Sequence, residues 1–312
     1  MVSSTLNFRF SGHETFVCRY AWLPKAIREI DKNPLLFKDE DNAMVSLGVG
    51  KNMVRSICFW AEMAQIISKS KGDQKHEITS FGRELLGRDG YDSYLEKSHT
   101  LWLLHWKIAT NPTDPLFFWH QLLNYWHRAE FTESEIIPFL VKNTPPGSSL
   151  RSNSTLEAGY RVFVNSYVAT RSSKGEVAED NLDSPLVELD LVRRIGDRRA
   201  GGLGPRETIY SFNLDDKLAI TPVLFAYCLH DFWANNYPEE KTLPFRTIAV
   251  APGSPGQIFK LPESSVRRHL DLLKDSTSGA YAFEESASLQ LVIRKKATTP
   301  AALLEAIYDS EV

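Results

Sequence analysis

Residues 10–16, FSGHETF, set a histidine and a glutamate side by side between two phenylalanines. Such a pair could take part in phosphodiester cleavage in either of two ways. In a metal-dependent scheme, His13 would act as a base and Glu14 as a ligand to a divalent ion. In a metal-free scheme, His13 would be the general base, Tyr20 the nucleophile and Arg19 the phosphate clamp. The candidate catalytic residues are therefore His13, Glu14, Arg19 and Tyr20.

The same residues also allow a purely structural interpretation. Glu14 would pair with Arg19 or Lys25, His13 would fill a polar pocket, and Ser11 or Thr15 would cap a helix that the apolar spacing predicts over residues 16–31. Neighbouring side chains converge on a loop but diverge by about 100° on a helix. The conformation of this stretch therefore decides between the two interpretations.

A second group of polar residues lies where a DNA-reading helix would expose them. Residues 41–87 run as a short helix, a glycine-containing turn, a longer helix, two short extended pieces and another helix start, which is the order of a winged helix-turn-helix. The start of the longer helix would face the major groove, and lysines of the wing would meet phosphates. The predicted DNA contacts of this unit are Lys51, Asn52, Arg55, Lys69 and Lys71. The alternative is a solvated helix face.

Further basic residues lie in the C-terminal half. Alternation in residues 191–195 and 208–213 predicts a β-ribbon, and a helix begun at Pro262 followed by a hairpin predicts a second winged-helix-like unit near 218–296. The secondary DNA candidates in these elements are Arg198, Arg199, Arg267 and Arg268, and ordinary surface charge is the alternative for each.

Two patterns bear on cofactors. Glu179, Asp180 and Asp183 could bind magnesium or manganese, or could belong to a solvated linker. Residues 48–51, GVGK, lack the spacing of a phosphate-binding loop and follow no predicted strand, so no ATP is expected.

The composition predicts a multidomain protein with a reduced, cytoplasmic setting. The chain has 312 residues, 43% of them hydrophobic, and no signal-like or membrane-spanning run. Its three cysteines are widely separated, which argues against a disulfide scaffold or a cysteine-based zinc site. Because 36 basic residues face 39 acidic ones, contact with nucleic acid requires a local basic face.

The predicted fold is mainly α with small β-hairpins, an α+β protein. A winged-helix domain at 1–90 would be followed by an aromatic-rich helical domain at 91–145, where tryptophans are dense. Pro, Gly, Ser and Asn gather at residues 143–154 and predict a boundary. An α+β domain at 155–312 would contain the second winged-helix-like unit.

Five segments in this order carry a resemblance that spans almost the whole chain: FSGHETF, RYAWLPK, LGVGKNMVRSICFW, EDNLDSPLVEL and SPGQIFKL. Together they resemble a bacterial domain-of-unknown-function family that includes the SspB proteins of the Ssp DNA phosphorothioation and phage-defence system. The resemblance implies a nickase, an endonuclease that cuts one DNA strand. It also implies three partners that replace a phosphate oxygen by sulfur: a cysteine desulfurase, an ATPase and an ATP-pyrophosphatase-like protein. The alternative function is a non-catalytic winged-helix adaptor or regulator that binds DNA and recruits the modification partners.

Overall fold

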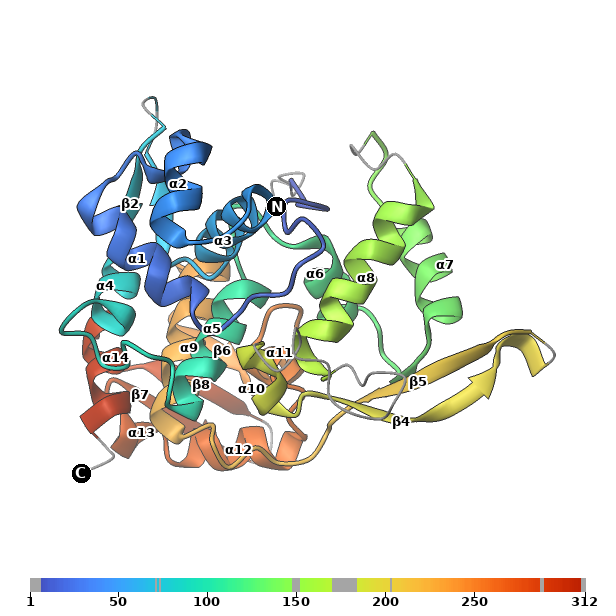
Figure 1. Ribbon diagram of the computed structural model, residues 1–312. Helices are drawn as coiled ribbons and strands as arrows, with labels where there is room; N and C mark the ends of the chain where they lie inside the picture. The colour runs from blue at the N-terminus through green and yellow to red at the C-terminus, as the bar shows by residue number, and fades with distance from the viewer. Residues whose placement is uncertain are drawn as a thin grey trace. The chain divides into compact units, whose positions relative to one another are not determined.

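The computed structural model describes residues 7–70, 72, 74–147, 152–169, 184–202, 204–286 and 289–309 (Figure 1). Contacts within the chain gather in two compact units. The first contains residues up to 122 together with 128–213, and the second contains 123–127 together with the chain from 214 onward. Two units of dense contacts do not test whether the chain folds as three domains, so the predicted division at 1–90, 91–145 and 155–312 stays a prediction.

The first unit opens with a helical region that ends in a small hairpin. Its elements are α1 (Trp22–Lys32), η1 (Leu36–Lys38), α2 (Glu40–Leu47), α3 (Lys51–Met63), β1 (Ile67–Lys69), β2 (His76–Ile78) and α4 (Ser80–Leu86). Asp39 caps α2 by accepting a hydrogen bond from the Asn42 amide, and Gly48 ends this helix in the left-handed conformation (φ 64°). The order helix, glycine turn, helix, antiparallel hairpin agrees with the order predicted from the sequence.

The rest of the first unit packs helices against a three-stranded antiparallel sheet of order β3-β5-β4. Its elements are α5 (Ser98–Ala109), α6 (Phe117–Asn124), β3 (Glu130–Phe131), α7 (Glu133–Asn143), α8 (Asn153–Tyr167), η3 (Pro185–Leu189), β4 (Val192–Arg199), η4 (Ala200–Gly202) and β5 (Arg206–Phe212). As expected, the dense aromatic residues form a core. Within it, the Tyr167 hydroxyl lies 2.7 Å from His105 Nδ1 and accepts a hydrogen bond from Trp119 Nε1 at 2.8 Å. These bonds satisfy polar atoms that burial would otherwise leave unpaired.

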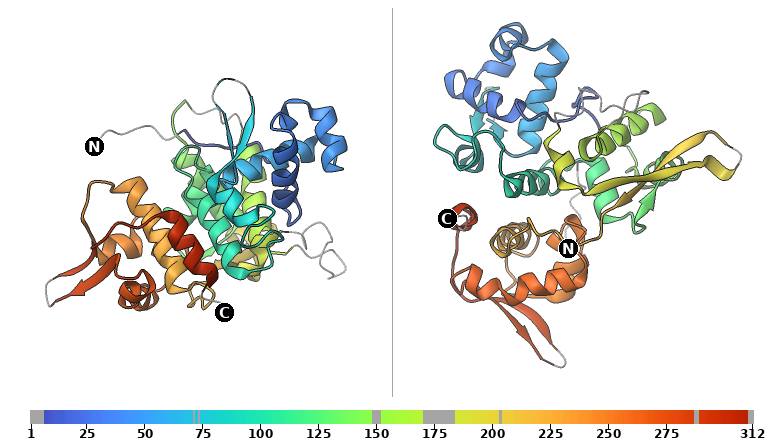
Figure 2. Two further views of the ribbon diagram at one scale, coloured as in Figure 1. Left: turned by 90° about the vertical axis from the view of Figure 1, so that its left-hand side faces the viewer. Right: turned by 60° about the horizontal axis from the view of Figure 1, so that its bottom comes forward.

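The second unit is built around α9, a buried apolar helix capped by Thr221, with α14 packed beside it (Figure 2). Its elements are α9 (Pro222–Asn236), β6 (Thr242–Pro244), α10 (Phe245–Val250), α11 (Pro255–Ile258), α12 (Glu263–Asp271), α13 (Leu273–Ser276), β7 (Tyr281–Glu285), β8 (Gln290–Arg294) and α14 (Pro300–Asp309). The strands form an antiparallel sheet of order β6-β8-β7. With about half of the chain helical and its sheets small and antiparallel, the predicted α+β class is confirmed.

In the described ranges, no helix combines the length and apolar character that crossing a bilayer requires.

Candidate functional site where the N-terminal loop meets helix α3

The FSGHETF stretch is a loop docked on α3. Ser56 Oγ donates to the His13 carbonyl at 3.0 Å, and Trp60 Nε1 donates to the Phe16 carbonyl at 3.1 Å. The predicted helix over 16–31 therefore starts late, at Trp22, and Thr15 does not cap it. The late start has a tertiary cause. Side chains of α3 donate hydrogen bonds to the His13 and Phe16 carbonyls, which in a helix would accept from backbone amides. Glu14 and Thr15 instead adopt left-handed backbone conformations (φ 48° and 65°).

His13 points into the protein. Its side chain is buried, its ring meets Phe59 edge to face with centroids 5.7 Å apart, and its Nδ1 accepts a hydrogen bond from the Thr15 amide at 3.1 Å. Burial lowers the pKa of His13 to about 4, so the ring is neutral at pH 7. This environment matches the polar-pocket interpretation of His13, and its role as a general base stays a prediction.

Arg19 and Tyr20 contact other parts of the first unit. The guanidinium of Arg19 lies over the Trp22 ring, 5.4 Å from its centroid. Tyr20 donates its hydroxyl proton to Glu188 in η3. Burial and the Glu188 carboxylate raise the pKa of Tyr20, so its hydroxyl stays protonated. To act as a nucleophile, the Tyr20 hydroxyl would first have to break its hydrogen bond to Glu188.

Glu14 instead borders a cavity of about 280 Å³ formed by four parts of the chain. The loop contributes Arg9 and Glu14, η1 and α2 contribute Phe37 and Glu40, α3 contributes Arg55, Cys58 and Glu62, and the β1–β2 hairpin contributes Lys69 and His76. Three predicted residues, Glu14, Arg55 and Lys69, thus come together. Arg9, Glu62 and His76 were not among the predicted site residues, although the four-residue spacing of Cys58 and Glu62 indicates a shared helix face.

Glu62 contacts two other residues that line this cavity, Arg9 and His76. Its Oε2 lies 2.9 Å from Arg9 Nη1, and its Oε1 lies 3.2 Å from His76 Nε2. Cys58 Sγ lies 3.5 Å from His76 Nε2 and 3.9 Å from Glu62 Oε1. Burial alone would raise the pKa of Glu62, but hydrogen bonds from His76 and Arg9 outweigh it and hold that pKa below its ordinary value. Glu62 is therefore a carboxylate at neutral pH.

The residues predicted to read DNA from α3 are exposed, but two of them are paired with a carboxylate. Lys51 Nζ lies 2.8 Å from one oxygen of Glu40, and Arg55 Nε lies 2.6 Å from the other. Hydrogen bonds from Arg55 and Lys51 lower the pKa of Glu40 to about 2. Asn52 is exposed on the same turn. Lys69 ends β1, and Lys71 lies outside the described residues.

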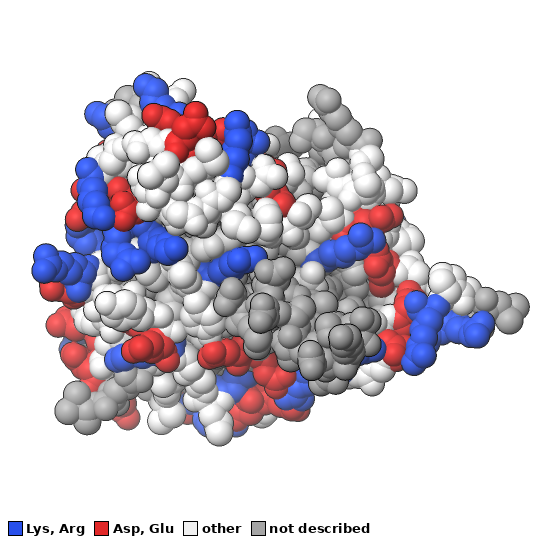
Figure 3. All heavy atoms as spheres, in the orientation of Figure 1, with Lys and Arg blue, Asp and Glu red and all other residues white. Residues whose placement is uncertain are grey.

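The secondary basic candidates are likewise exposed and mostly paired. Arg198 lies 2.9 Å from Glu135 and 3.3 Å from Glu207, while Arg199 is exposed at the end of β4. In the second unit, Arg267 lies 2.6 Å from Glu285 and Arg268 contacts Asp216. On the face drawn in Figure 3, blue basic side chains are accordingly interspersed with red acidic ones. The predicted magnesium ligands Glu179, Asp180 and Asp183 lie outside the described residues.

A groove between α1 and α4 that carries charges of both signs was not predicted. A cavity of about 850 Å³ is lined there by four basic residues, Arg28, Lys32, Arg83 and Arg88, and three acidic ones, Asp31, Glu84 and Asp89, and Arg83 lies 3.6 Å from Asp31. Figure 3 shows blue side chains gathered over this region. The spacing of Arg28 and Lys32 by four residues would have put both on one helix face.

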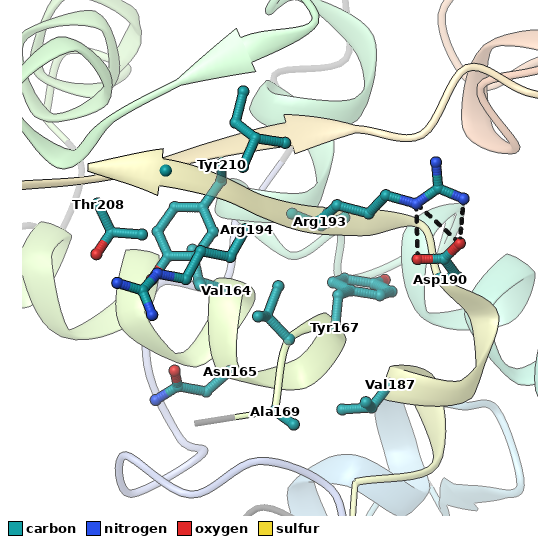
Figure 4. A pocket seen from close by; sticks show the side chains of 14 residues that line it. Val164, Asn165, Tyr167, Ala169, Val187, Asp190, Arg193, Arg194, Thr208 and Tyr210 are labelled. Carbon is teal, nitrogen blue, oxygen red and sulfur yellow. Dashed lines mark hydrogen bonds and ion pairs between the residues drawn. The ribbon is translucent and has the colours of Figure 1, made fainter. Parts of the chain in front are cut away.

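A third cavity, of about 860 Å³, lies between α8, η3 and the β4–β5 ribbon (Figure 4). Arg193 Nε lies 3.0 and 2.9 Å from the two oxygens of Asp190, and Arg194 lies 2.9 Å from Asp197. Carboxylates thus already engage both guanidinium groups, and the walls are partly apolar at Val164 and Val187. In this respect it resembles the Glu14 cavity, where Glu62 and Glu40 pair with Arg9 and Arg55.

These features define an α+β protein in which a loop, helices α2 and α3 and a hairpin surround a polar cavity. The chain belongs to the family described as "Protein of unknown function (DUF4007)", whose model matches residues 10–308. Its fold is similar to a magnesium ion-bound SspB crystal structure, with a TM-score of 0.82 and 24% sequence identity. A second SspB crystal structure gives a TM-score of 0.81 at 24% identity, and each match covers 98% of this chain and 88% of the other. Comparison with curated proteins gives no significant match.

Proposed function

We propose that the protein binds duplex DNA and cuts one strand in a bacterial DNA phosphorothioation and phage-defence system. The observation that carries the proposal is the SspB-like fold along nearly the whole chain, together with family membership. The proposed partners are a cysteine desulfurase, an ATPase and an ATP-pyrophosphatase-like protein. The contacts around α3 support the proposal at the level of residues.

DNA would approach the exposed start of α3, with α2, α3 and the β1–β2 hairpin acting as a winged helix. Lys51 and Asn52 stand at the N-terminus of α3, where free backbone amides and the helix dipole favour a phosphate. Lys69 on the hairpin would meet the backbone of the same duplex. Because Glu40 pairs with both Lys51 and Arg55, DNA phosphates would have to displace the Glu40 carboxylate.

Strand cutting would take place at the Glu14 cavity. Arg9, Arg55 and Lys69 supply positive charge that a phosphodiester requires, and Glu14 is the cavity carboxylate without an ion pair in the described part of the chain. Magnesium and manganese prefer oxygen ligands, so Glu14 would be the residue to hold such an ion beside the scissile phosphate. A bound divalent ion would neutralise charge on the phosphate and activate a water molecule.

A non-catalytic adaptor is the second candidate, and one observation favours it. The side chain of His13, the predicted general base, is buried against Phe59. In this alternative the same helices would bind DNA or recruit modification partners without hydrolysis.

Incubation with supercoiled plasmid separates the two functions. A nickase converts the plasmid to open circles in magnesium or manganese and stops in EDTA, whereas an adaptor shifts its mobility and leaves it intact. We expect Glu14→Gln to lower the nicking rate by about 100-fold or more while DNA affinity is retained. Equal nicking rates for the wild type and Glu14→Gln would show that Glu14 takes no part in strand cutting.

The DNA-binding surface is tested by two opposite charge changes. Lys51→Ala should weaken binding and reduce the slope of log affinity against log salt by about 1. Glu40→Gln should strengthen binding, because it releases Lys51 and Arg55. Lys274→Ala, at an exposed lysine of α13, serves as the control. Unchanged affinity in both Lys51→Ala and Glu40→Gln would place the DNA-binding surface elsewhere, and the α1–α4 groove would be the next candidate.

A further inference from the structure

Cys58, Glu62 and His76 bring a sulfur, an oxygen and a nitrogen atom to one point of the cavity. Cys58 Sγ and His76 Nε2 are 3.5 Å apart, His76 Nε2 and Glu62 Oε1 are 3.2 Å apart, and Cys58 Sγ and Glu62 Oε1 are 3.9 Å apart. Among the residues that the structure describes, this is the group of His, Cys, Asp and Glu side chains that could hold a metal ion.

These separations are close to the edges of a zinc-centred tetrahedron. Zinc binds cysteine sulfur at about 2.3 Å, histidine nitrogen at about 2.0–2.1 Å and carboxylate oxygen at about 2.0–2.2 Å. In tetrahedral geometry these bonds put the ligand atoms about 3.3–3.6 Å from one another. The sulfur–nitrogen distance of 3.5 Å lies in this range, and the nitrogen–oxygen distance of 3.2 Å is just below it. The sulfur–oxygen distance exceeds this range by a few tenths of an ångström, which a small rotation of the Glu62 carboxylate would close.

Regular elements hold the three ligands in place. Cys58 and Glu62 are four residues apart on α3 and therefore share one face of the helix. His76 begins β2, where its backbone amide donates to the Pro34 carbonyl and its ring contacts Phe37 edge to face at 5.3 Å. Arg9 Nη1 contacts the other Glu62 oxygen, Oε2, at 2.9 Å, as outer residues do around metal ligands.

We propose that Cys58, Glu62 and His76 form a binding site for zinc or a chemically similar transition-metal ion, with the fourth position open to the cavity. Three protein ligands with an open fourth position are typical of zinc sites that bind water or substrate. A thiolate and an imidazole are poor ligands for magnesium, so this site is separate from any magnesium site at Glu14. The proposal does not depend on DNA cutting.

The charges of the ligands themselves match those of a divalent ion. A Cys58 thiolate and the Glu62 carboxylate would balance two positive charges, and His76 would bind through Nε2 with its proton on Nδ1. Burial and the Glu62 carboxylate raise the pKa of the Cys58 thiol, so it is protonated in the absence of a cation. Metal binding would therefore release the thiol proton.

Cobalt(II) provides a spectroscopic test on the full-length protein, without DNA. After removal of bound metal by a chelator, titration with Co²⁺ should give thiolate-to-cobalt charge-transfer absorption and the visible bands of tetrahedral cobalt. One equivalent per chain should saturate both signals, zinc should abolish them, and excess magnesium should leave them unchanged. Absence of the charge-transfer band in the wild type would overturn the proposal.

Variants assign the ligands. Cys58→Ser should lose the charge-transfer band, and His76→Gln and Glu62→Gln should weaken cobalt binding, with folding checked by circular dichroism. Cys18→Ala and Cys228→Ala, at buried cysteines outside the group, should keep the wild-type spectrum. If the ligand variants fail to fold, the rate of Cys58 alkylation in the wild-type protein provides an independent test. Zinc should slow this alkylation, and an unchanged rate would contradict the site.

Discussion

At the scale of the residue, the loop conformation points the side chains of His13 and Glu14 into different surroundings, although the sequence allows both to act in one catalytic site. The His13 ring is buried against Phe59, whereas Glu14 borders the polar cavity. A buried histidine is favourable only while it is neutral, because removing the charged form from water is costly. The stability of the protein should therefore depend on pH at this residue.

The His13 pKa, lowered from 6.5 to about 4, predicts a loss of stability in mild acid. As pH falls below 6.5 the unfolded chain binds a proton first, so the free energy of unfolding decreases until the folded state also binds one near pH 4. At about 1.4 kcal/mol per pKa unit, His13 accounts for about 3 kcal/mol of this loss. Urea unfolding between about pH 7 and 4.5 measures the free energy of unfolding and its pH slope.

His13→Asn keeps a hydrogen-bond acceptor for the Thr15 amide and removes the titration, so its unfolding free energy should fall less steeply with pH. His120 and His269 have similarly lowered pKa values, about 4 each, and should leave a residual slope. Parallel curves for wild type and His13→Asn would contradict the assigned cause.

At the scale of the element, α3 is the organiser of the candidate site. One side of the helix is buried through Val54, Ile57 and Ala61, while another carries the polar cavity residues. The N-terminal loop closes over α3 at Gly12, whose φ of +116° and close approach to Phe59 exclude a side chain. Docking of the loop should therefore be sensitive to a single methyl group.

Gly12→Ala should destabilise the protein by about 2–4 kcal/mol, because an alanine Cβ would lie 2.7 Å from Phe59 Cδ2 on a backbone that disfavours it. Thermal and urea unfolding measure the loss. Gly196 in β4 lies outside the left-handed region, and a Cβ added there would meet no atom within 4 Å. Gly196→Ala is therefore the matched control and should change stability little. Equal stability of both variants would mean that the loop does not pack on α3 in solution.

Local signals explain what could be predicted at this scale. Gly48 and the apolar spacing of α3 specify two helices joined by a tight turn, because turn conformation and burial periodicity are encoded by neighbours in sequence. The late start of α1 depends on Ser56 and Trp60, which are distant in sequence, and no local pattern reveals it. The cavity is a similar case, since a loop, two helices and a hairpin assemble it. The sequence could single out Glu14 as a candidate, but it could not show that Arg9 and His76 lie beside Glu62.

At the scale of the whole molecule, the chain passes between its two compact units more than once. Residues 123–127 belong with the chain from 214 onward, although their sequence neighbours on both sides belong to the first unit. Buried polar contacts tie this short segment into the second unit. The Leu123 carbonyl accepts from Gln257 Nε2 and Lys260 Nζ, each at 2.6 Å, and Asn124 Oδ1 accepts from the Gly253 amide at 2.7 Å.

Lys260 makes this connection dependent on pH. Burial lowers its pKa from 10.5 to about 7, so between these values the unfolded chain holds a proton that the folded protein lacks. The free energy of unfolding should therefore rise with pH in this window, by about 2 kcal/mol between about pH 7.5 and 9. Lys260→Met fills similar volume without a charge and should abolish this rise, while Gln257 continues to satisfy the Leu123 carbonyl. Lys274→Met, at an exposed position, should keep the wild-type slope in urea unfolding at the same pH values. An unchanged slope in Lys260→Met would show that Lys260 stays charged when folded, and that its bond to the Leu123 carbonyl outweighs the cost of burial.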